Sequence, residues 1–123
     1  MEEKLSDIGE KELINRLKQF TPENQINDDT ALINCKTEQI LINNDVLVEN
    51  IHFSNTTASF QDIGWKSVTS NLSDLAASGV EEIIGVTIGL VAPKNTQWQA
   101  IKSIYEGIDE ALKCFGGHIL GGD

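Results

Sequence analysis

Acidic side chains at four separate places are the residues of this sequence whose type and position could do chemistry. Asp28 and Asp29 precede an apolar run, and Asp45 follows another. Asp74 lies in a stretch that reads as the end of a packed helix, and Asp123 comes after two glycines. Carboxylate oxygens suit Mg²⁺, and acids gathered together repel one another unless divalent cations neutralise them. We therefore expect these acids to converge on metal ions that carry the phosphates of a nucleotide.

Each of these positions also has a plainer structural interpretation, and the residues by themselves leave both open. Asn and Asp favour turns, so the pair Asp28 and Asp29 is typical of a turn before an apolar run. Asp45 fits a strand that reaches the surface. Asp74 fits a solvated acid beside a helix end, although the negative end of the helix dipole makes a bound cation a natural compensation. A single histidine such as His52 is more often partly buried and satisfied than a ligand or base.

The usual motifs for phosphate binding and nucleophilic catalysis are absent. The sequence contains neither G-x-x-x-x-G-K-[ST] nor G-x-G-x-x-G, and no protein-kinase catalytic set. Cys35 and Cys114 lack the spacing of metal ligands and are interpreted as reduced core residues. What remains is dispersed carboxylates with flanking amides and hydroxyls, so no side chain is assigned as a catalytic nucleophile, acid or base.

Charge and composition narrow the class of partner. The 123 residues include 19 acidic and 9 basic side chains, a net charge of −10 without a cluster of Lys or Arg. Nucleic acids and anionic membranes are therefore not expected as partners, and phosphate-bearing substrates would need cations as intermediaries. No apolar run approaches the roughly 20 residues of a membrane span, and the charged N-terminus is unlike a signal peptide. We expect one cytoplasmic domain.

Hydrophobic periodicity predicts an α+β fold. Capping signals at Ser59 with Asp62 and at Thr96 with Gln99 predict where two long helices begin, and Gly79 predicts where the first of them ends. The expected elements are a helix before residue 21, a hairpin of strands 31–35 and 39–53, a helix over 60–78, a strand over 82–92, a helix that runs to residue 115 and a last strand from 118.

This order of elements favours a two-layer sandwich, in which a mixed four-stranded sheet carries helices on one face. In the strand over 82–92, Gly85, Thr87 and Gly89 leave one face nearly without side chains, while the opposite face is bulky. A face so bare must approach something closely. We expect a two-fold dimer in which the sheets of two copies pack together or close into a barrel.

Six motifs follow one another along essentially the whole chain, and each is weak by itself. They are D-I-G-E-x-x-L-I-x-R-L (7–17), N-D-D-T-A (27–31), N-D-V-L-V-E-N-I-H-F (44–53), G-W-K-S-V-T-S-N-L-S-D-L-A-A-S-G (64–79), I-Y-E-G-I (104–108) and G-G-D (121–123). Together they resemble the N-terminal domain of thiamine-monophosphate kinase, in a superfamily with aminoimidazole-ribonucleotide synthetase and selenophosphate synthetase.

The resemblance implies a kinase that transfers the γ-phosphoryl group of ATP to thiamine monophosphate, with several Mg²⁺ ions and no covalent enzyme intermediate. It also implies that residues 1–123 are the ATP- and Mg²⁺-binding, dimerising N-terminal domain of a longer two-domain protein. His52 takes the position that contacts the substrate. The residues that it places at the metal are Asp29, Asn43, Asn44, Asp45, Asp74 and Asp123, and those at the nucleotide are Tyr105, Gly122 and Asp123.

The sequence departs from the family pattern at several of these positions. Asn27 and Asn50 stand where the family has glycine, and asparagine tolerates the left-handed backbone angles that such turns require. Asn43 and Asn44 replace a Ser-Thr pair, so amide oxygens would take the place of hydroxyls at the metal. Two other interpretations stay open: the matching domain of another ATP-using member of the superfamily, and a metal-binding dimerisation fragment without catalysis of its own.

Overall fold

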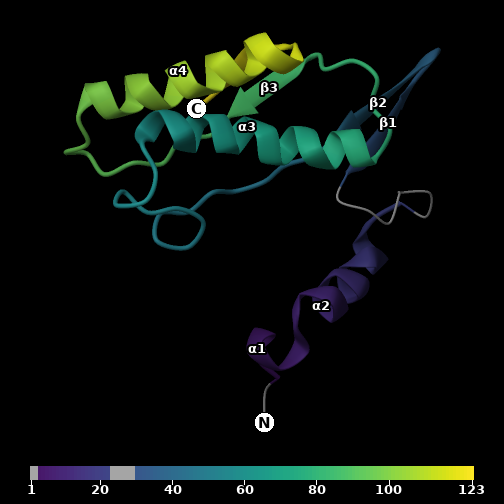
Figure 1. Cartoon of the computed structure of the whole chain (residues 1–123). Helices are drawn as coiled ribbons and strands as arrows, with labels where there is room; N and C mark the ends of the chain where they lie inside the picture. The colour runs from purple at the N-terminus through teal and green to yellow at the C-terminus, as the bar shows by residue number, and fades with distance from the viewer. Residues whose placement is uncertain (1–2, 23–29) are drawn as a thin grey trace.

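Two long helices that run in the same direction and two small sheets make up most of the structure, a computed structural model that describes residues 3–22 and 30–123. The helices α3 and α4 pack along each other, while α1 and α2 extend away from them (Figure 1). The elements in order are α1 (Leu5–Ile8), α2 (Glu10–Leu17), the 3-10 turn η1 (Lys18–Phe20), β1 (Ala31–Cys35), β2 (Glu38–Ile42), α3 (Phe60–Ala77), β3 (Gly85–Ile88), α4 (Trp98–Phe115) and β4 (His118–Gly122).

Local sequence signals account for both ends of α3. The Ser59 hydroxyl accepts a hydrogen bond from the Asp62 backbone at 3.1 Å, and the Asp62 carboxylate accepts one from the Ser59 backbone at 3.0 Å. This reciprocal pair is the predicted capping box. After Ala77 the chain leaves the helix through Gly79, whose φ of +84° is the left-handed angle that glycine adopts without strain. By contrast, α4 begins at Trp98 with Gln97 as an N-cap that makes no side-chain bond, so the capping pair expected at Thr96 and Gln99 is wrong.

The core lies where α3, α4 and β3 meet. Its buried members are Val68 of α3 with Ile108, Ala111 and Leu112 of α4. Burying each large aliphatic side chain contributes about 1.5–3 kcal/mol, so this cluster is the main source of stability for the helix pair. Partly buried side chains that pack against the cluster are Trp65, Leu72, Val86, Ile88 and Ile104.

Two glycines set how closely the long helices approach. A Cβ atom added to Gly64 of α3 would lie 1.9 Å from the backbone oxygen of Ile104, and one added to Gly107 of α4 would lie 2.0 Å from that of Gln61. Real Cβ atoms do not come this close to backbone, so only residues without a side chain fit at either position. The backbones of the two helices are therefore in direct contact at the crossing point, and this close approach lets the neighbouring apolar side chains pack together.

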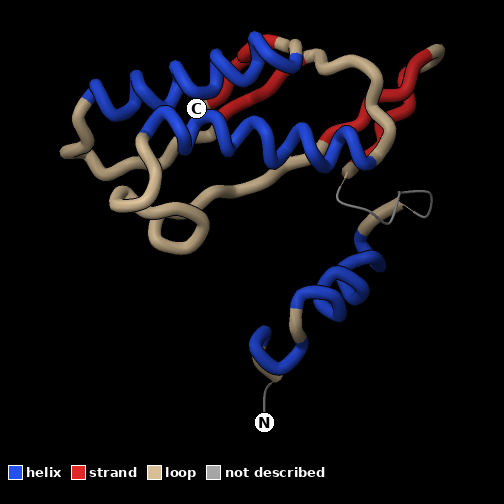
Figure 2. The backbone as a smooth tube through the Cα atoms, viewed as in Figure 1, coloured by secondary structure: helices blue, strands red, loops and turns tan. Residues whose placement is uncertain are grey.

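The strands form two separate pairs rather than the expected single four-stranded sheet. Strands β1 and β2 are an antiparallel hairpin with Ala31 opposite Ile42, and β3 and β4 are parallel, with Gly85 opposite His118 (Figure 2). A strand needs backbone partners, and residues 43–53 form no strand pairing in the described part of the chain except an isolated bridge between Glu49 and Phe53. The strand expected over 39–53 therefore ends at Ile42, and the one expected over 82–92 is confined to β3.

The two faces of β3 differ as the sequence predicts. Val86 and Ile88 pack against the helix core, while Thr87 is exposed and a Cβ on Gly89 would meet nothing within 4 Å. Gly85 lies against its own chain instead, because a Cβ there would approach the His118 backbone oxygen to 2.3 Å. Part of the bare face is thus covered by β4, and a second copy is not needed to explain Gly85.

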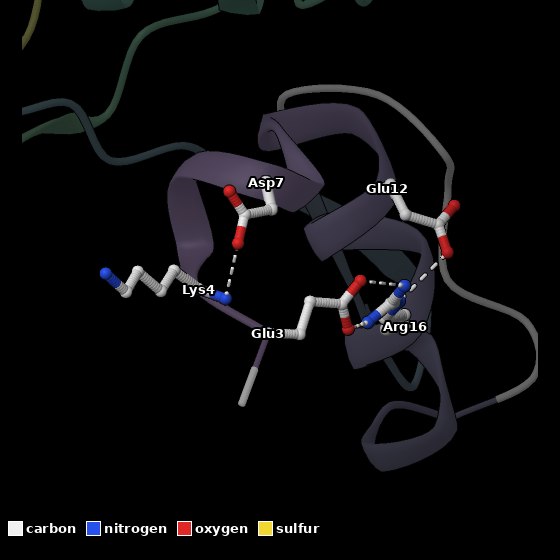
Figure 3. A network of polar contacts seen from close by, with 5 residues as sticks. All are labelled: Glu3, Lys4, Asp7, Glu12 and Arg16. Atoms are coloured by element: carbon white, nitrogen blue, oxygen red, sulfur yellow. Dashed lines mark hydrogen bonds and ion pairs between the residues drawn. The ribbon is translucent and has the colours of Figure 1, made fainter. Parts of the chain in front are cut away.

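The N-terminal segment is two short helices rather than one. Gly9, with a φ of +76°, separates α1 from α2. Arg16 joins them by donating to Glu3 at 2.6 Å and to Glu12 at 3.0 Å, while the Asp7 carboxylate accepts from the Lys4 backbone at 3.0 Å (Figure 3). The hydrogen bonds from Arg16 lower the pKa of Glu3, and those to Glu3 and Glu12 raise the pKa of Arg16.

Two further expectations concern single residues and the membrane. Cys35 and Cys114 are free, but both are exposed, so their assignment to the core is wrong. Their apolar neighbours in sequence indicated burial, whereas the face on which each side chain falls is set by packing. In residues 3–22 and 30–123, no helix has the length and apolar character needed to cross a membrane.

Candidate functional site

Asp74 lies near the C-terminal end of α3, and an amide from a distant segment approaches it. The Asn43 side chain, directly after β2, donates from Nδ2 to Asn71 Oδ1 at 3.1 Å, to the Asn71 backbone oxygen at 3.2 Å and to Asp74 Oδ2 at 3.5 Å. All three residues are half-buried. The structure therefore joins two of the predicted metal-site residues, Asn43 and Asp74, across 31 positions of sequence.

Asn71 organises this contact, and the sequence reasoning gave it no role. It is one turn before Asp74 on α3, and its Nδ2 donates to the Ser67 backbone oxygen at 2.8 Å. That bond orients the amide so that Oδ1 faces Asn43. Because residues three apart share a helix face, the spacing of Asn71 and Asp74 in the sequence already places the two side chains together.

The neighbouring Asn44 and Asp45 are placed differently. Both are exposed, and the Asp45 carboxylate accepts from the backbone of the next residue, Val46, at 3.0 Å. This short-range bond fixes the side chain at the start of the segment that follows β2. Within the described residues, neither side chain makes a hydrogen bond to α3, so the structure adds no contact that assembles them with Asp74.

His52 belongs to a closed turn beside α3. The Val48 backbone donates to His52 Nδ1 at 2.8 Å, and the His52 backbone donates to the Val48 oxygen at 2.9 Å. Asn50 takes a φ of 64°, which confirms the expectation that asparagine supports the left-handed angle at this glycine position of the family. Lys66 of α3 donates from Nζ to the His52 backbone oxygen at 2.7 Å.

The end of β4 brings Gly122 and Asp123 against β3. The Asp123 backbone donates to the Ile88 oxygen at 2.9 Å, and the Leu90 backbone donates to the Asp123 oxygen at 2.6 Å. A Cβ on Gly122 would lie 1.9 Å from the Ile88 oxygen, so this position requires glycine. The backbone at Asp123 is therefore fixed, and its carboxylate is free of hydrogen bonds from the described residues. Tyr105, the other predicted nucleotide contact, is half-buried on α4.

The convergence of the acids on metal ions stays a prediction. Asp28 and Asp29 lie outside the described residues. Over residues 3–22 and 30–123, no three side chains of His, Cys, Asp or Glu are grouped so that they could hold a metal ion. The assembled unit is one carboxylate with two amides, Asp74 with Asn43 and Asn71. This set offers oxygen ligands of the kind Mg²⁺ takes, and that ion usually completes its shell with water and substrate phosphates.

Known proteins are similar to this chain over most of its length. Residues 27–123 match the family described as AIR synthase related protein, N-terminal domain. The thiamine-monophosphate kinase of Prochlorococcus marinus is 52% identical over 99% of this chain, and that of Synechococcus elongatus is 39% identical over 97%. This chain spans 37% and 36% of those two proteins.

Solved structures give the same similarity in three dimensions. One described as AaThiL complexed with AMPPCP and TMP has a TM-score of 0.84 and 27% identity, and it matches 99% of this chain with 39% of its own. A second, thiamine monophosphate kinase from Aquifex aeolicus, has a TM-score of 0.78 at 26% identity, over 98% of this chain and 39% of its own. The α+β arrangement described above is thus also that of a longer protein with a nucleotide analogue bound.

Proposed function

Since this chain belongs to the AIR synthase related proteins and carries their N-terminal domain, we propose that the protein phosphorylates thiamine monophosphate to thiamine diphosphate with ATP. The chain spans less than two-fifths of the kinases that it matches, so the proposal concerns the whole protein. The observation that carries it is the contact of Asn43 with Asn71 and Asp74 in a chain 52% identical to such a kinase. It joins the residue directly before the motif of 44–53 to the motif of 64–79, at the carboxylate that the resemblance places at the metal.

The residues fit a reaction that depends on positioning and charge neutralisation. Phosphoryl transfer needs the phosphates held in line and their charge compensated, rather than a protein nucleophile. We propose that Asp74, Asp45 and Asp123 hold Mg²⁺, with Asn43, Asn44 and Asp29 as further ligands. Bound Mg²⁺ would neutralise the phosphates, which the net charge of −10 would otherwise repel.

The chain's own groups have distinct tasks in this proposal. Asn43 and Asn71 orient the Asp74 carboxylate, and the rigid helix α3 keeps it in place. Gly122 lets β4 approach β3 closely enough to fix the Asp123 backbone. His52 contacts the thiamine monophosphate, and Tyr105 with Gly122 and Asp123 contacts the nucleotide. The roles of His52 and Tyr105 come from the family resemblance.

Substitution of Asp74 tests the proposal most directly. In the full-length protein, assayed with ATP, Mg²⁺ and thiamine monophosphate, Asp74→Asn should lower turnover at least a hundredfold, because an oriented charge at the phosphates is lost. The melting temperature without Mg²⁺ should stay within about 2 °C of the parent. Glu82→Gln is the matched control, since it removes an exposed carboxylate that makes no hydrogen bond or ion pair in the described residues.

Three results would contradict the proposal. A full-length parent that forms no thiamine diphosphate, but uses ATP on a different acceptor, would favour another member of the superfamily. A parent without any ATP turnover would favour a metal-binding dimerisation fragment. A fall of several degrees in the metal-free melting temperature of Asp74→Asn would show that Asp74 is structural.

We also propose that the protein is a two-fold dimer through the face of β3 that bears Gly85, Thr87 and Gly89. Thr87 is exposed, and a Cβ on Gly89 would meet nothing within 4 Å, so this end of the face is open to a second copy. The hairpin of β1 and β2 also leaves strand edges without partners in the described residues. Sedimentation should give twice the monomer mass at tens of micromolar, and a monomer at that concentration would refute this interface.

A further inference from the structure

Residues 44–58 lie in the connection from β2 to α3, between Asn43 and Ser59, which each make a hydrogen bond to α3, and they contain no helix or strand of their own. Their side chains and backbone make hydrogen bonds mostly within this segment, such as Asn55 to Glu49 at 2.6 Å and Asn50 to Phe53 at 2.7 Å. The single hydrogen bond from this described segment to α3 is the one that Lys66 donates to the His52 oxygen at 2.7 Å. That bond attaches the turn to a rigid element at the residue that carries the imidazole.

The imidazole of His52 is itself oriented by its own turn. Because Nδ1 accepts a hydrogen bond from the Val48 backbone at 2.8 Å, the proton of the neutral ring resides on Nε2. The ring nitrogen left to bind a ligand is therefore a hydrogen-bond donor, and it suits an acceptor oxygen such as that of a phosphate. The Val48 bond sets the ring within the turn, and the Lys66 bond sets the turn on α3.

We propose that Lys66 is a positioning residue, which holds the turn of residues 48–53 on α3 so that His52 presents its Nε2–H to the phosphoryl acceptor. This inference rests on the proposed function for the identity of the acceptor. The ammonium of Lys66 acts through the His52 backbone and does not itself contact the substrate. A charged donor to a carbonyl is stronger than a neutral one, which suits a tether at an exposed position.

The same ammonium has a second conceivable use, because it is close to His52 in an acidic chain. If Lys66 contacted the substrate phosphate directly, replacing Lys66 would also weaken substrate binding. The two uses differ in their dependence on His52. If Lys66 only positions the turn, replacing it has no effect on substrate binding once the His52 imidazole is removed. If Lys66 contacts the substrate directly, replacing it weakens binding with or without that imidazole.

A double-mutant cycle in the full-length protein separates these uses. Lys66→Met should raise the KM for thiamine monophosphate on the order of tenfold, since displacing a reacting group by about 1 Å weakens such sites strongly. The KM for ATP should change less than about twofold, and Lys66→Arg, which keeps a charged donor, should restore most of the loss. In a His52→Ala background, Lys66→Met should have no further effect.

The control is Lys102→Met, which removes an exposed lysine of α4 that is paired with Glu106 at 3.7 Å. It should leave both KM values unchanged. Additive effects of Lys66→Met and His52→Ala would overturn the tether, as would a Lys66→Met protein with an unaltered KM for thiamine monophosphate.

A second measurement keeps the inference testable if the proposed function fails. Nitrogen NMR of the parent should show His52 with Nδ1 unprotonated and Nε2 protonated, because of the Val48 bond. Lys66→Met should shift or broaden these ring signals, while Lys102→Met should leave them in place. A parent that does not phosphorylate thiamine monophosphate but shows this NMR difference would refute the function and retain the tether. Identical His52 signals in both variants would refute the tether.

Discussion

Replacing Gly107 with alanine tests whether the backbone crossing of α3 and α4 sets the stability of the protein. The new Cβ would lie 2.0 Å from the Gln61 oxygen and 3.0 Å from the Trp65 nitrogen. An ordinary approach of carbon to a carbonyl oxygen is about 3.3–3.6 Å. The helices would therefore have to separate by more than about 1 Å at the crossing.

Two opposing effects decide the sign of this change. Alanine is a better helix former than glycine by about 0.8–1 kcal/mol, which favours the variant. Overpacking against rigid backbone costs about 1–3 kcal/mol or more, and separation also loosens Ile108, Ala111 and Leu112, which are at most 4% exposed. We expect a net destabilisation of about 2 kcal/mol, because the obstacle is backbone and not the flexible end of a side chain.

Chemical and thermal unfolding of the full-length protein measure this difference. The transition of this domain should fall by about 10 °C for 2 kcal/mol. Ser73→Ala is the matched control, because this side chain is exposed on α3 and makes no hydrogen bond in the described residues, and it should change stability by less than about 1 kcal/mol. Gly64→Ala should resemble Gly107→Ala, and the double variant should cost less than the sum, since one separation relieves both contacts. A Gly107→Ala protein as stable as the parent would refute the reasoning.

Two further predictions follow. Ser59→Ala should cost about 1 kcal/mol in unfolding experiments, because the first turn of α3 loses its cap. The hydrogen bonds of Ser59 lower the pKa of Asp62, so the stabilisation from this pair is complete above the unfolded pKa of Asp62 and is lost as the pH falls through the folded pKa. Equal losses of stability in acid for the parent and the variant would contradict this. Residues 1–123 prepared alone should form no thiamine diphosphate with ATP, Mg²⁺ and thiamine monophosphate, because the resemblance places further ligands outside them, and steady product above an enzyme-free blank would refute this.

Local chemistry determined the elements whose ends depend on nearby residues. The capping box of Ser59 with Asp62 and the turn at Gly79 set the limits of α3, because their hydrogen bonds and backbone angles involve residues only a few positions apart. The same locality placed Asp74 near the end of that helix. Periodicity also identified which face of β3 packs on the helices, through Val86 and Ile88.

Strand lengths could not be predicted in this way. The apolar sequence beyond Ile42 reads as strand, but a ladder forms only where another backbone supplies partners, and that is a property of the whole arrangement. For the same reason the two strand pairs did not merge into the single sheet that the pattern favoured. The exposure of Cys35 and Cys114 likewise depends on neighbours that are distant in sequence.

The sequence by itself determined the two long helices, the capping of α3, the acidic motifs and the resemblance, since each is written in consecutive residues or in fixed spacing. Only the tertiary structure decided that Asn43 meets Asn71 and Asp74, and that Lys66 meets His52. These contacts join segments 14 or more positions apart, and they exist because the chain after β2 returns along α3. Their geometry depends on how helices and strands pack, which no local preference of either segment specifies.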